Sequence, residues 1–260
     1  MAPPVSVRHV VDELARDPLP NIVLLKHLLA YPQHSRVHRV SDAAGAATLV
    51  VLDASVSSYD RKACPGAAFV VLISSDHPDL TAQLMCHVPR GVGIVFKLSR
   101  DADLAAVEAQ FAVKPRTAVV SFTSSGPVEP ASGLQITTRP SDAAFRLFES
   151  QGHDRAWLEP LLRDGTAFAC VLERGGDALS ACFAFENYGP VWEVGGVITA
   201  PSERGRGLGA DVVRTVLAEL TRRGLKPRYQ VEGDNAASTA LARSVGLTPF
   251  LTIAHYTHEC

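Results

Sequence analysis

Residues 190–215 read Pro-Val-Trp-Glu-Val-Gly-Gly-Val-Ile-Thr-Ala-Pro-Ser-Glu-Arg-Gly-Arg-Gly-Leu-Gly-Ala-Asp-Val-Val-Arg-Thr. The first part, from Val191 to Ile198, is rich in β-branched and aromatic residues and predicts a strand. From Leu208 onward, apolar residues recur at the spacing of one helix face, which predicts an amphipathic helix. A glycine-rich turn, Arg204–Gly209, therefore joins a strand to a helix.

This turn has the composition of an anion-binding site. The first N–H groups of a helix have no partner within it and lie at the positive end of the helix dipole. Glycines let a ligand approach the backbone closely, and Arg204 and Arg206 add positive charge. The alternating glycines do not fit the dinucleotide pattern G-x-G-x-x-G, and no Gly-Lys-Ser/Thr of a P-loop follows. The sequence predicts a phosphate- or pyrophosphate-binding loop of another kind.

The pattern Arg204-x-x-Gly207-x-Gly209 resembles the pyrophosphate-binding loop of the GNAT superfamily of acetyl-CoA-dependent N-acyltransferases. A second segment supports the resemblance. Residues 228–231 are expected to form a strand, and Asn235-x-x-Ser238-x-x-Leu241 opens a helix that ends before Gly246. This is similar to the family's second motif, and the two motifs occur in the family's order.

The resemblance implies a GNAT fold over residues 134–260. This is an α/β (α+β) architecture, in which a mixed, mostly antiparallel central sheet is flanked by helices. The expected order is a strand, two helices, three antiparallel strands, and then helix, strand, helix, strand. Residues 126–133 are rich in turn-forming residues and are expected to be a linker.

Residues 1–125 show a fainter version of the same order of elements. The corresponding loop, Ser74–Leu80, lacks Arg and Gly and carries Asp76 and Asp79, which would repel a pyrophosphate. The expectation is a degenerate GNAT-like N-terminal domain without CoA binding, as in tandem GNAT proteins that resemble glycine N-acyltransferase. The alternative is an unrelated α/β cap.

The resemblance also implies which residues bind acetyl-CoA, the co-substrate. Backbone groups at the end of the strand would polarise the thioester carbonyl, and the loop would hold the pyrophosphate. The second motif would complete the site. The implied residues are Val197, Ile198, Thr199, Arg204, Gly205, Arg206, Gly207, Leu208, Gly209, Ala210, Asn235 and Ser238.

Glu193 is the first candidate for the base that deprotonates the acceptor amine. Its place on the strand resembles that of the catalytic glutamate in glycine N-acyltransferase-like enzymes, and burial would raise the pKa of a carboxyl group towards neutrality. The alternative is that Glu193 lies on a solvated face. Glu186, Tyr229 and Glu232 are reserve candidates.

The sequence leaves the general acid open, because Ala242 occupies the position at which many members of the family have a tyrosine. Ser238, Tyr256 or water is then the expected proton donor to the leaving thiolate.

Composition and charge limit the partners, the compartment and the metal chemistry that can be expected. The 260 residues carry a formal net charge of -2 without a basic stretch, so neither nucleic acid nor a membrane is an expected partner. The five cysteines are scattered and predict reduced thiols in a cytoplasmic protein. Cys170 and Cys182 are expected in the core, and no metal site is expected. A monomer or a homodimer is expected.

The resemblance implies an N-acetyltransferase that moves an acetyl (acyl) group from acetyl-CoA to a primary amine of a small molecule or amino acid. Transfer would be direct, in a ternary complex. The alternative is a non-catalytic acyl-CoA-binding regulatory module.

Overall fold

The computed structural model describes residues 6–124 and 126–259. The chain forms two compact units. The C-terminal unit contains residues 120–250, and the N-terminal unit contains the described residues up to Val119 together with those from Leu251 onward. Residues from Leu251 onward therefore pack with the N-terminal unit, whereas the sequence placed them with the C-terminal domain. The reason is the length of the last strand, β11 (Leu247–His258), whose second half pairs with a strand of the N-terminal unit.

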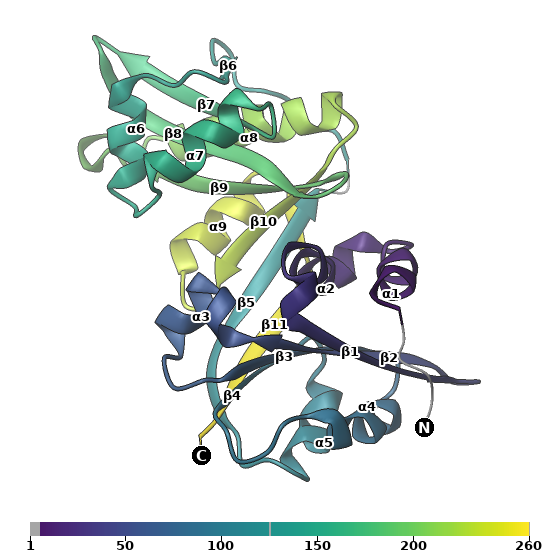
Figure 1. The fold of residues 1–260 in the computed structure, drawn as a ribbon. Helices are drawn as coiled ribbons and strands as arrows, with labels where there is room; N and C mark the ends of the chain where they lie inside the picture. The colour runs from purple at the N-terminus through teal and green to yellow at the C-terminus, as the bar shows by residue number, and fades with distance from the viewer. Residues whose placement is uncertain (1–5, 125, 260) are drawn as a thin grey trace. The chain divides into compact units, whose positions relative to one another are not determined.

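The C-terminal unit has the order of elements that the sequence predicts (Figure 1). After the end of β5 (Lys114–Ser124), its elements are β6 (Ile136–Thr137), α6 (Asp142–Glu149), α7 (Arg155–Arg163), β7 (Ala167–Arg174), β8 (Asp177–Tyr188), β9 (Val191–Thr199), α8 (Leu208–Arg222), β10 (Lys226–Glu232) and α9 (Ala236–Ser244). Ser141 caps α6, since its hydroxyl accepts a hydrogen bond from the Ala144 N–H at 3.1 Å.

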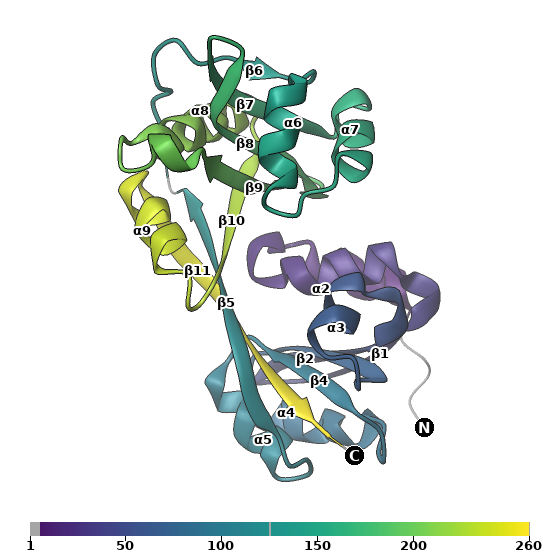
Figure 2. The same cartoon turned by 90° about the vertical axis from the view of Figure 1, so that its left-hand side faces the viewer.

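The strands of this unit lie in the order β5-β10-β9-β8-β7-β6. The pairs β6–β7, β7–β8 and β8–β9 are antiparallel, and β9–β10 is parallel. Helix α8 covers one face of the sheet, and α6 and α7 cover the other (Figure 2). The alternation of side chains along β7 shows why: Phe168 and Cys170 pack with α8, whereas Ala167 and Ala169 pack with α6 and α7.

A β-bulge interrupts β9 at Gly196. The register with β8 shifts between Ala181 and Phe183, and Gly196 has a φ of +60°. A Cβ at this position would lie 2.1 Å from the Phe183 ring, so both the backbone conformation and the close ring require glycine.

Beyond the middle of β9 the two parallel strands separate. Their pairing covers only Val191–Val194 of β9 and Lys226–Tyr229 of β10. The β10-facing edge of β9 from Gly195 to Thr199 therefore carries backbone groups that β10 does not use. An unused strand edge of this kind can bind an extended ligand.

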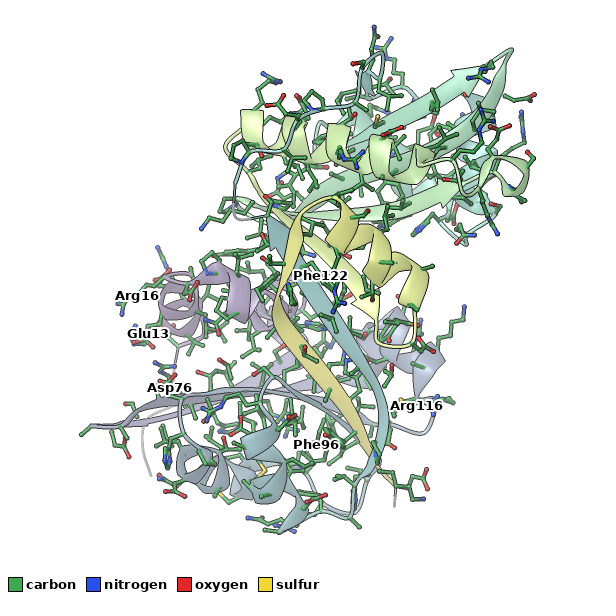
Figure 3. The ribbon with its side chains drawn as sticks, turned by 180° about the vertical axis from the view of Figure 1, so that it is seen from behind. Glu13, Arg16, Asp76, Phe96, Arg116 and Phe122 are labelled. Atoms are coloured by element: carbon green, nitrogen blue, oxygen red, sulfur yellow. The ribbon has the colours of Figure 1, made fainter. Side chains whose placement is uncertain are left out.

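The N-terminal unit also has a sheet, with the order β1-β2-β3-β4-β11. Its core is built around Phe96, and the core of the C-terminal unit includes Phe122; both are labelled in Figure 3. Its elements are α1 (Val7–Leu14), α2 (Pro18–Ala30), β1 (Ser35–Asp42), β2 (Gly45–Asp53), α3 (Ser58–Ala63), β3 (Phe69–Ser75), α4 (Pro78–Leu84), β4 (Ile94–Leu98) and α5 (Leu104–Glu108).

Helix α3 is an addition to the order of elements that the sequence predicts for residues 1–125. This helix has six residues, too few to show a periodic apolar face. Its start is fixed instead by Ser57, whose hydroxyl accepts a hydrogen bond from the Asp60 N–H.

Candidate active site

The glycine-rich turn has the geometry of an anion-binding loop. Gly205 and Gly207 have φ values of +76° and +82°, and Gly207 is the N-cap of α8. The first backbone bond at the start of this helix runs from the Asp211 N–H to the Gly207 carbonyl. Within the described part of the chain, the N–H groups of residues 204–210 donate to no other group. These free donors at the positive end of a 15-residue helix favour a bound anion.

The two arginines of this loop have partners of their own. Arg206 forms an ion pair with Glu203, and Arg204 Nε donates to the Thr199 carbonyl at 3.3 Å. The carboxylate of Glu203 partly neutralises the charge of Arg206, and the side chain of Arg204 is bound to a backbone carbonyl. The backbone N–H groups are therefore the main donors that the loop offers to an anion. Gly209 lies close to β9, since a Cβ there would be 3.3 Å from Thr199 Oγ1.

The second motif forms the start of α9. Asn235 is the N-cap, and its side-chain oxygen accepts a hydrogen bond from the Ser238 N–H at 2.9 Å. The Ser238 hydroxyl lies 2.8 Å from the hydroxyl of Tyr229 on β10. Burial raises the pKa of Tyr229, so this phenol keeps its proton at neutral pH.

Ala242 is fully buried in the core between α8 and the sheet. A tyrosine at this position would need a space that the core does not contain. The phenol that contacts the second motif is that of Tyr229, which comes from β10 rather than from α9.

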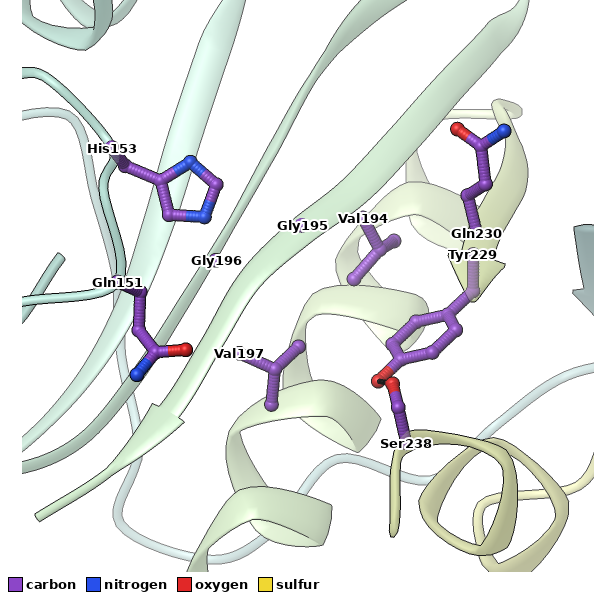
Figure 4. Close-up of a pocket in the computed structure, with 9 residues that line it drawn as sticks. All are labelled: Gln151, His153, Val194, Gly195, Gly196, Val197, Tyr229, Gln230 and Ser238. Atoms are coloured by element: carbon purple, nitrogen blue, oxygen red, sulfur yellow. Dashed lines mark hydrogen bonds between the residues drawn. The ribbon is translucent and has the colours of Figure 1, made fainter. Parts of the chain in front are cut away.

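A cavity of about 170 Å³ lies where β9 and β10 separate. Figure 4 shows Gln151 and His153 on one side of β9, and Val194, Val197, Tyr229 and Ser238 on the other side, towards α8 and α9. Gly195 and Gly196 of β9 and Gln230 of β10 complete the lining. Burial lowers the pKa of His153, which therefore presents a neutral imidazole at neutral pH.

Glu193 lies on the face of β9 that carries α6 and α7, directly opposite Phe185 of β8 and Arg228 of β10. Its Oε2 accepts hydrogen bonds from Arg228 Nη1 at 2.9 Å and from Asn187 Nδ2. Arg228 is only 3% exposed, and its Nε donates to Ser121 Oγ at 3.2 Å. Burial lowers the pKa of Arg228, and the Glu193 carboxylate opposes this effect.

Glu193 is therefore half-buried and has an ionic partner, which differs from the two environments considered from the sequence. Its side chain is 17% exposed, so it lies neither on a solvated face nor in apolar surroundings. Its second oxygen, Oε1, accepts no hydrogen bond from the described residues.

The other residues that the sequence offers as acid or base lie in different parts of the structure. Glu186 and Glu232 are exposed. Tyr256 belongs to the N-terminal unit, where it pairs with Phe96 and packs against that unit's core. The cavity thus brings together Val197, Ser238 and Tyr229. Its lining includes neither Tyr256 nor Glu193, which directly precedes the lining residue Val194 on β9.

None of the described residues that line the cavity is a cysteine. Cys170 and Cys182 are fully buried, as the sequence predicts, and burial raises the pKa of both thiols, that of Cys170 to about 11. The described residues contain no group of three or more His, Cys, Asp or Glu side chains placed to hold a metal ion. None of the described helices has the length and apolar character needed to cross a membrane.

Sequence reasoning missed Gln151, His153, Asn187 and Arg228. The first two follow α6 in a turn without a motif, and only folding brings them beside β9. A signal did exist for Arg228, since a charged residue within the buried run Pro227–Tyr229 needs a partner of opposite charge.

Residues 135–247 match the model of the acetyltransferase (GNAT) family. No curated protein matches the sequence. The fold resembles that of a GNAT-family acetyltransferase from Colwellia psychrerythraea, with a TM-score of 0.61 and 16% identity over 99% of each chain. It also resembles a GCN5-related N-acetyltransferase from Kribbella flavida, with a TM-score of 0.56 and 14% identity over 92% of this chain and 95% of that one.

A third solved structure has the two-domain type of organisation. It is a tandem GNAT protein from the clavulanic acid biosynthesis pathway, with a TM-score of 0.52 and 15% identity over 97% of this chain and 94% of that one. The family match covers the anion-binding loop, the cavity and the second motif. Residues 135–247 are thus similar to the acetyltransferase domains of the GNAT family, and the fold of the chain is that of the solved GNAT proteins.

Proposed function

We propose that the C-terminal unit transfers an acetyl group from acetyl-CoA to a primary amine of a small molecule, directly and within a ternary complex. One observation carries the proposal: a single strand, β9, has Glu193 and the cavity in its middle and leads into the anion-binding loop at its end. A phosphate-bearing donor and an acceptor amine can therefore bind along one strand.

The loop holds the donor by its pyrophosphate. The free N–H groups from Arg206 to Ala210 donate to the phosphate oxygens, and the positive end of α8 stabilises their charge. The extended part of the donor lies along the unpaired edge of β9 from Val197 to Thr199, whose backbone groups bind it as a further strand would. Asn235 and Ser238 fix the start of α9, which carries the second motif, beside the bound donor.

Glu193 takes the proton of the amine through Oε1. The ion pair with Arg228 keeps the carboxylate in place and leaves this oxygen free to accept. Removal of the proton frees the nitrogen lone pair, so that the C–N bond forms as the thioester C–S bond breaks, and the nitrogen then releases a second proton to water as the amide forms. Backbone N–H groups at the β9 edge stabilise the charge that develops on the carbonyl oxygen.

Tyr229 and Ser238 supply the proton that the leaving sulfur takes. Their hydroxyls form a hydrogen-bonded pair in the cavity lining, and the raised pKa of Tyr229 keeps it protonated for this step. The proton gained at Glu193 equals the one lost at Tyr229, and exchange with water returns both groups to their starting states.

The N-terminal unit is proposed to be a degenerate copy that binds no CoA. Its elements follow the GNAT order, but the loop between β3 and α4 is occupied by its own contacts. Asp76 Oδ2 accepts a hydrogen bond from the Ala46 N–H at 2.8 Å, and α4 has only seven residues. A carboxylate at this loop opposes a phosphate ligand.

The rival function is a non-catalytic acyl-CoA-binding module. Titration of the whole chain with acetyl-CoA, followed by measurement of thiol release over a panel of primary amines, separates the two. The enzyme requires saturable binding and amine-dependent thiol release. Binding without release for every amine would establish the rival, and absence of binding would reject both.

A further inference from the structure

A buried polar atom without a partner lies on the side chain that contacts Glu193. Asn187 Oδ1 is buried and has no hydrogen-bond partner among the described residues. Its amide orientation is fixed, because the carboxylate of Glu193 only accepts and the Asn187 nitrogen must therefore face it. A buried acceptor left unpaired is costly, so a donor that reaches this oxygen as the amide shifts would stabilise it.

The missing donor fits an amine. Asn187 Oδ1 and Glu193 Oε1 are both acceptors without a partner in the described chain, and they belong to side chains that are hydrogen-bonded to each other. A primary amine carries more than one N–H and can donate to both oxygens. Asn187 would then hold the amine while Glu193 takes its proton.

An aromatic wall begins at the same place. Phe185 is the cross-strand neighbour of Glu193, and Trp157 of α7 meets Phe185 edge-on, with ring centroids 5.2 Å apart at 85°. Trp157 also contacts Phe183, at 6.0 Å, and His153 meets Phe183 at 5.0 Å. Trp157 is 44% exposed, an unusual fraction for a tryptophan in contact with an aromatic core. Its free surface can receive a ring of the acceptor.

The cavity and the neighbouring arginines offer no unpaired cation for a carboxylate on the acceptor, since Arg155 of α7 is already paired with Asp142 and Glu159. None of the described residues that line the cavity has a positively charged side chain, and burial keeps His153 neutral at neutral pH. Arg228 is 3% exposed and is already bound to Glu193 and Ser121. An amino acid would bring an anion into this site without compensation, and it would also lie near the Glu193 carboxylate.

We propose that the acceptor is an arylalkylamine without a carboxylate, held by Asn187 at its nitrogen and by Trp157 and Phe185 at its ring. This inference rests on the proposed acetyl transfer and narrows its substrate class, since the sequence leaves small amines and amino acids equally open. Asn187 acts as a positioning residue for the nitrogen that all amines share. Trp157 acts only on amines that carry a ring.

The test compares phenethylamine, phenylalanine, ethylamine and glycine as acceptors, by thiol release at equal concentrations of unprotonated amine. Phenethylamine should have the highest kcat/KM. Trp157→Ala should lower its kcat/KM by about tenfold, mainly through KM, and leave ethylamine unchanged. Trp157→Phe should restore most of the loss, and Asn187→Ala should raise KM for both amines. Leu29→Ala, a change at another exposed apolar residue, is the matched control.

A second measurement needs no turnover. In a Trp192→Phe background, phenethylamine should quench the fluorescence of Trp157 saturably in the presence of CoA, and glycine should not. Preference for phenylalanine or glycine, or an equal effect of Trp157→Ala on phenethylamine and ethylamine, would overturn the inference while leaving acetyl transfer intact. Failure of the wild-type chain to acetylate any amine would instead reject the proposed function.

Discussion

Glu193 Oε2 lies 2.9 Å from Arg228 Nη1, although the two residues are 35 positions apart in the chain. The parallel register of β9 and β10 places them directly opposite each other on one face of the sheet. Since the guanidinium binds one carboxylate oxygen, the other remains free to act on a ligand. This pair is the basis of the first prediction.

Glu193→Gln should lower the rate of acetyl transfer by roughly 10²–10⁴-fold at neutral pH, the usual contribution of a general base. The affinity for CoA should not change, because the anion-binding loop does not use this side chain. The deficit should shrink as the pH rises, since more of the amine then arrives unprotonated. Steady-state rates measured from mildly acidic to alkaline pH check this.

The control is Glu186→Gln, which changes an exposed glutamate on the neighbouring strand and should leave the rate unaltered. A deficit of equal size at every pH would assign Glu193 a positioning role. Full activity of Glu193→Gln would remove it from the mechanism.

Gly207→Asp should abolish CoA binding, because it places a carboxylate where the free N–H groups of the loop receive the pyrophosphate. The matched control is Gly224→Asp, at the opposite end of α8. Both glycines have positive φ, +82° and +70°, and open space where a Cβ would lie, so the two changes carry similar backbone strain. Titration calorimetry with CoA, together with thermal unfolding, checks the result. Similar CoA affinities in the two variants would contradict the loop assignment.

Tyr229→Phe should lower kcat for acetyl-CoA, since it removes the phenol that protonates the leaving sulfur. With an acetyl thioester of an acidic aryl thiol, the deficit should largely vanish, because such a thiolate leaves without a proton. A purely structural effect of the change would persist with both donors.

Tyr256→Phe is the control for this prediction, because burial also raises the pKa of Tyr256 while the side chain packs in the N-terminal unit. A larger loss in Tyr256→Phe than in Tyr229→Phe would return the role of acid to Tyr256, one of the donors that the sequence leaves open.

The N-terminal unit should lose stability in mild acid. His27 and His255 lie near the buried ion pair of Lys97 and Asp60, and burial, followed by the charge of Lys97, lowers the pKa of each imidazole from 6.5 to about 4. Below pH 6.5 the unfolded chain binds protons that the folded chain does not, so the free energy of unfolding falls as the pH drops towards 4.

Each of these shifts corresponds to roughly 3 kcal/mol at about 1.4 kcal/mol per pKa unit. Urea unfolding at a series of pH values from neutral down to about 4 measures the loss, and His255→Gln should flatten the dependence. His34→Gln, at an exposed histidine, is the control. A free energy of unfolding that is constant over this range would disprove the assignment.

The sequence by itself determined the elements of the C-terminal unit and the glycine-rich turn at residues 204–209. These depend on local physics: glycines that adopt positive φ at residues 205 and 207, the Ser141 and Asn235 caps, and apolar residues at the period of a strand or a helix. Each feature lies within a few residues of its cause, so a linear pattern is enough to predict it. The two family motifs can likewise be read from short stretches of the sequence.

Only the tertiary structure decided the environment of the acceptor site. Glu193 obtains its charge partner from β10, its amide partner Asn187 from β8 and its aromatic neighbour Trp157, through Phe185, from α7. These contacts depend on strand register and on the packing of α7, which a linear pattern does not specify. For the same reason the sequence left the proton donor open among Ser238, Tyr256 and water and did not name Tyr229 as one. Folding pairs Ser238 with Tyr229, because β10 and α9 meet beside the point where β9 and β10 separate.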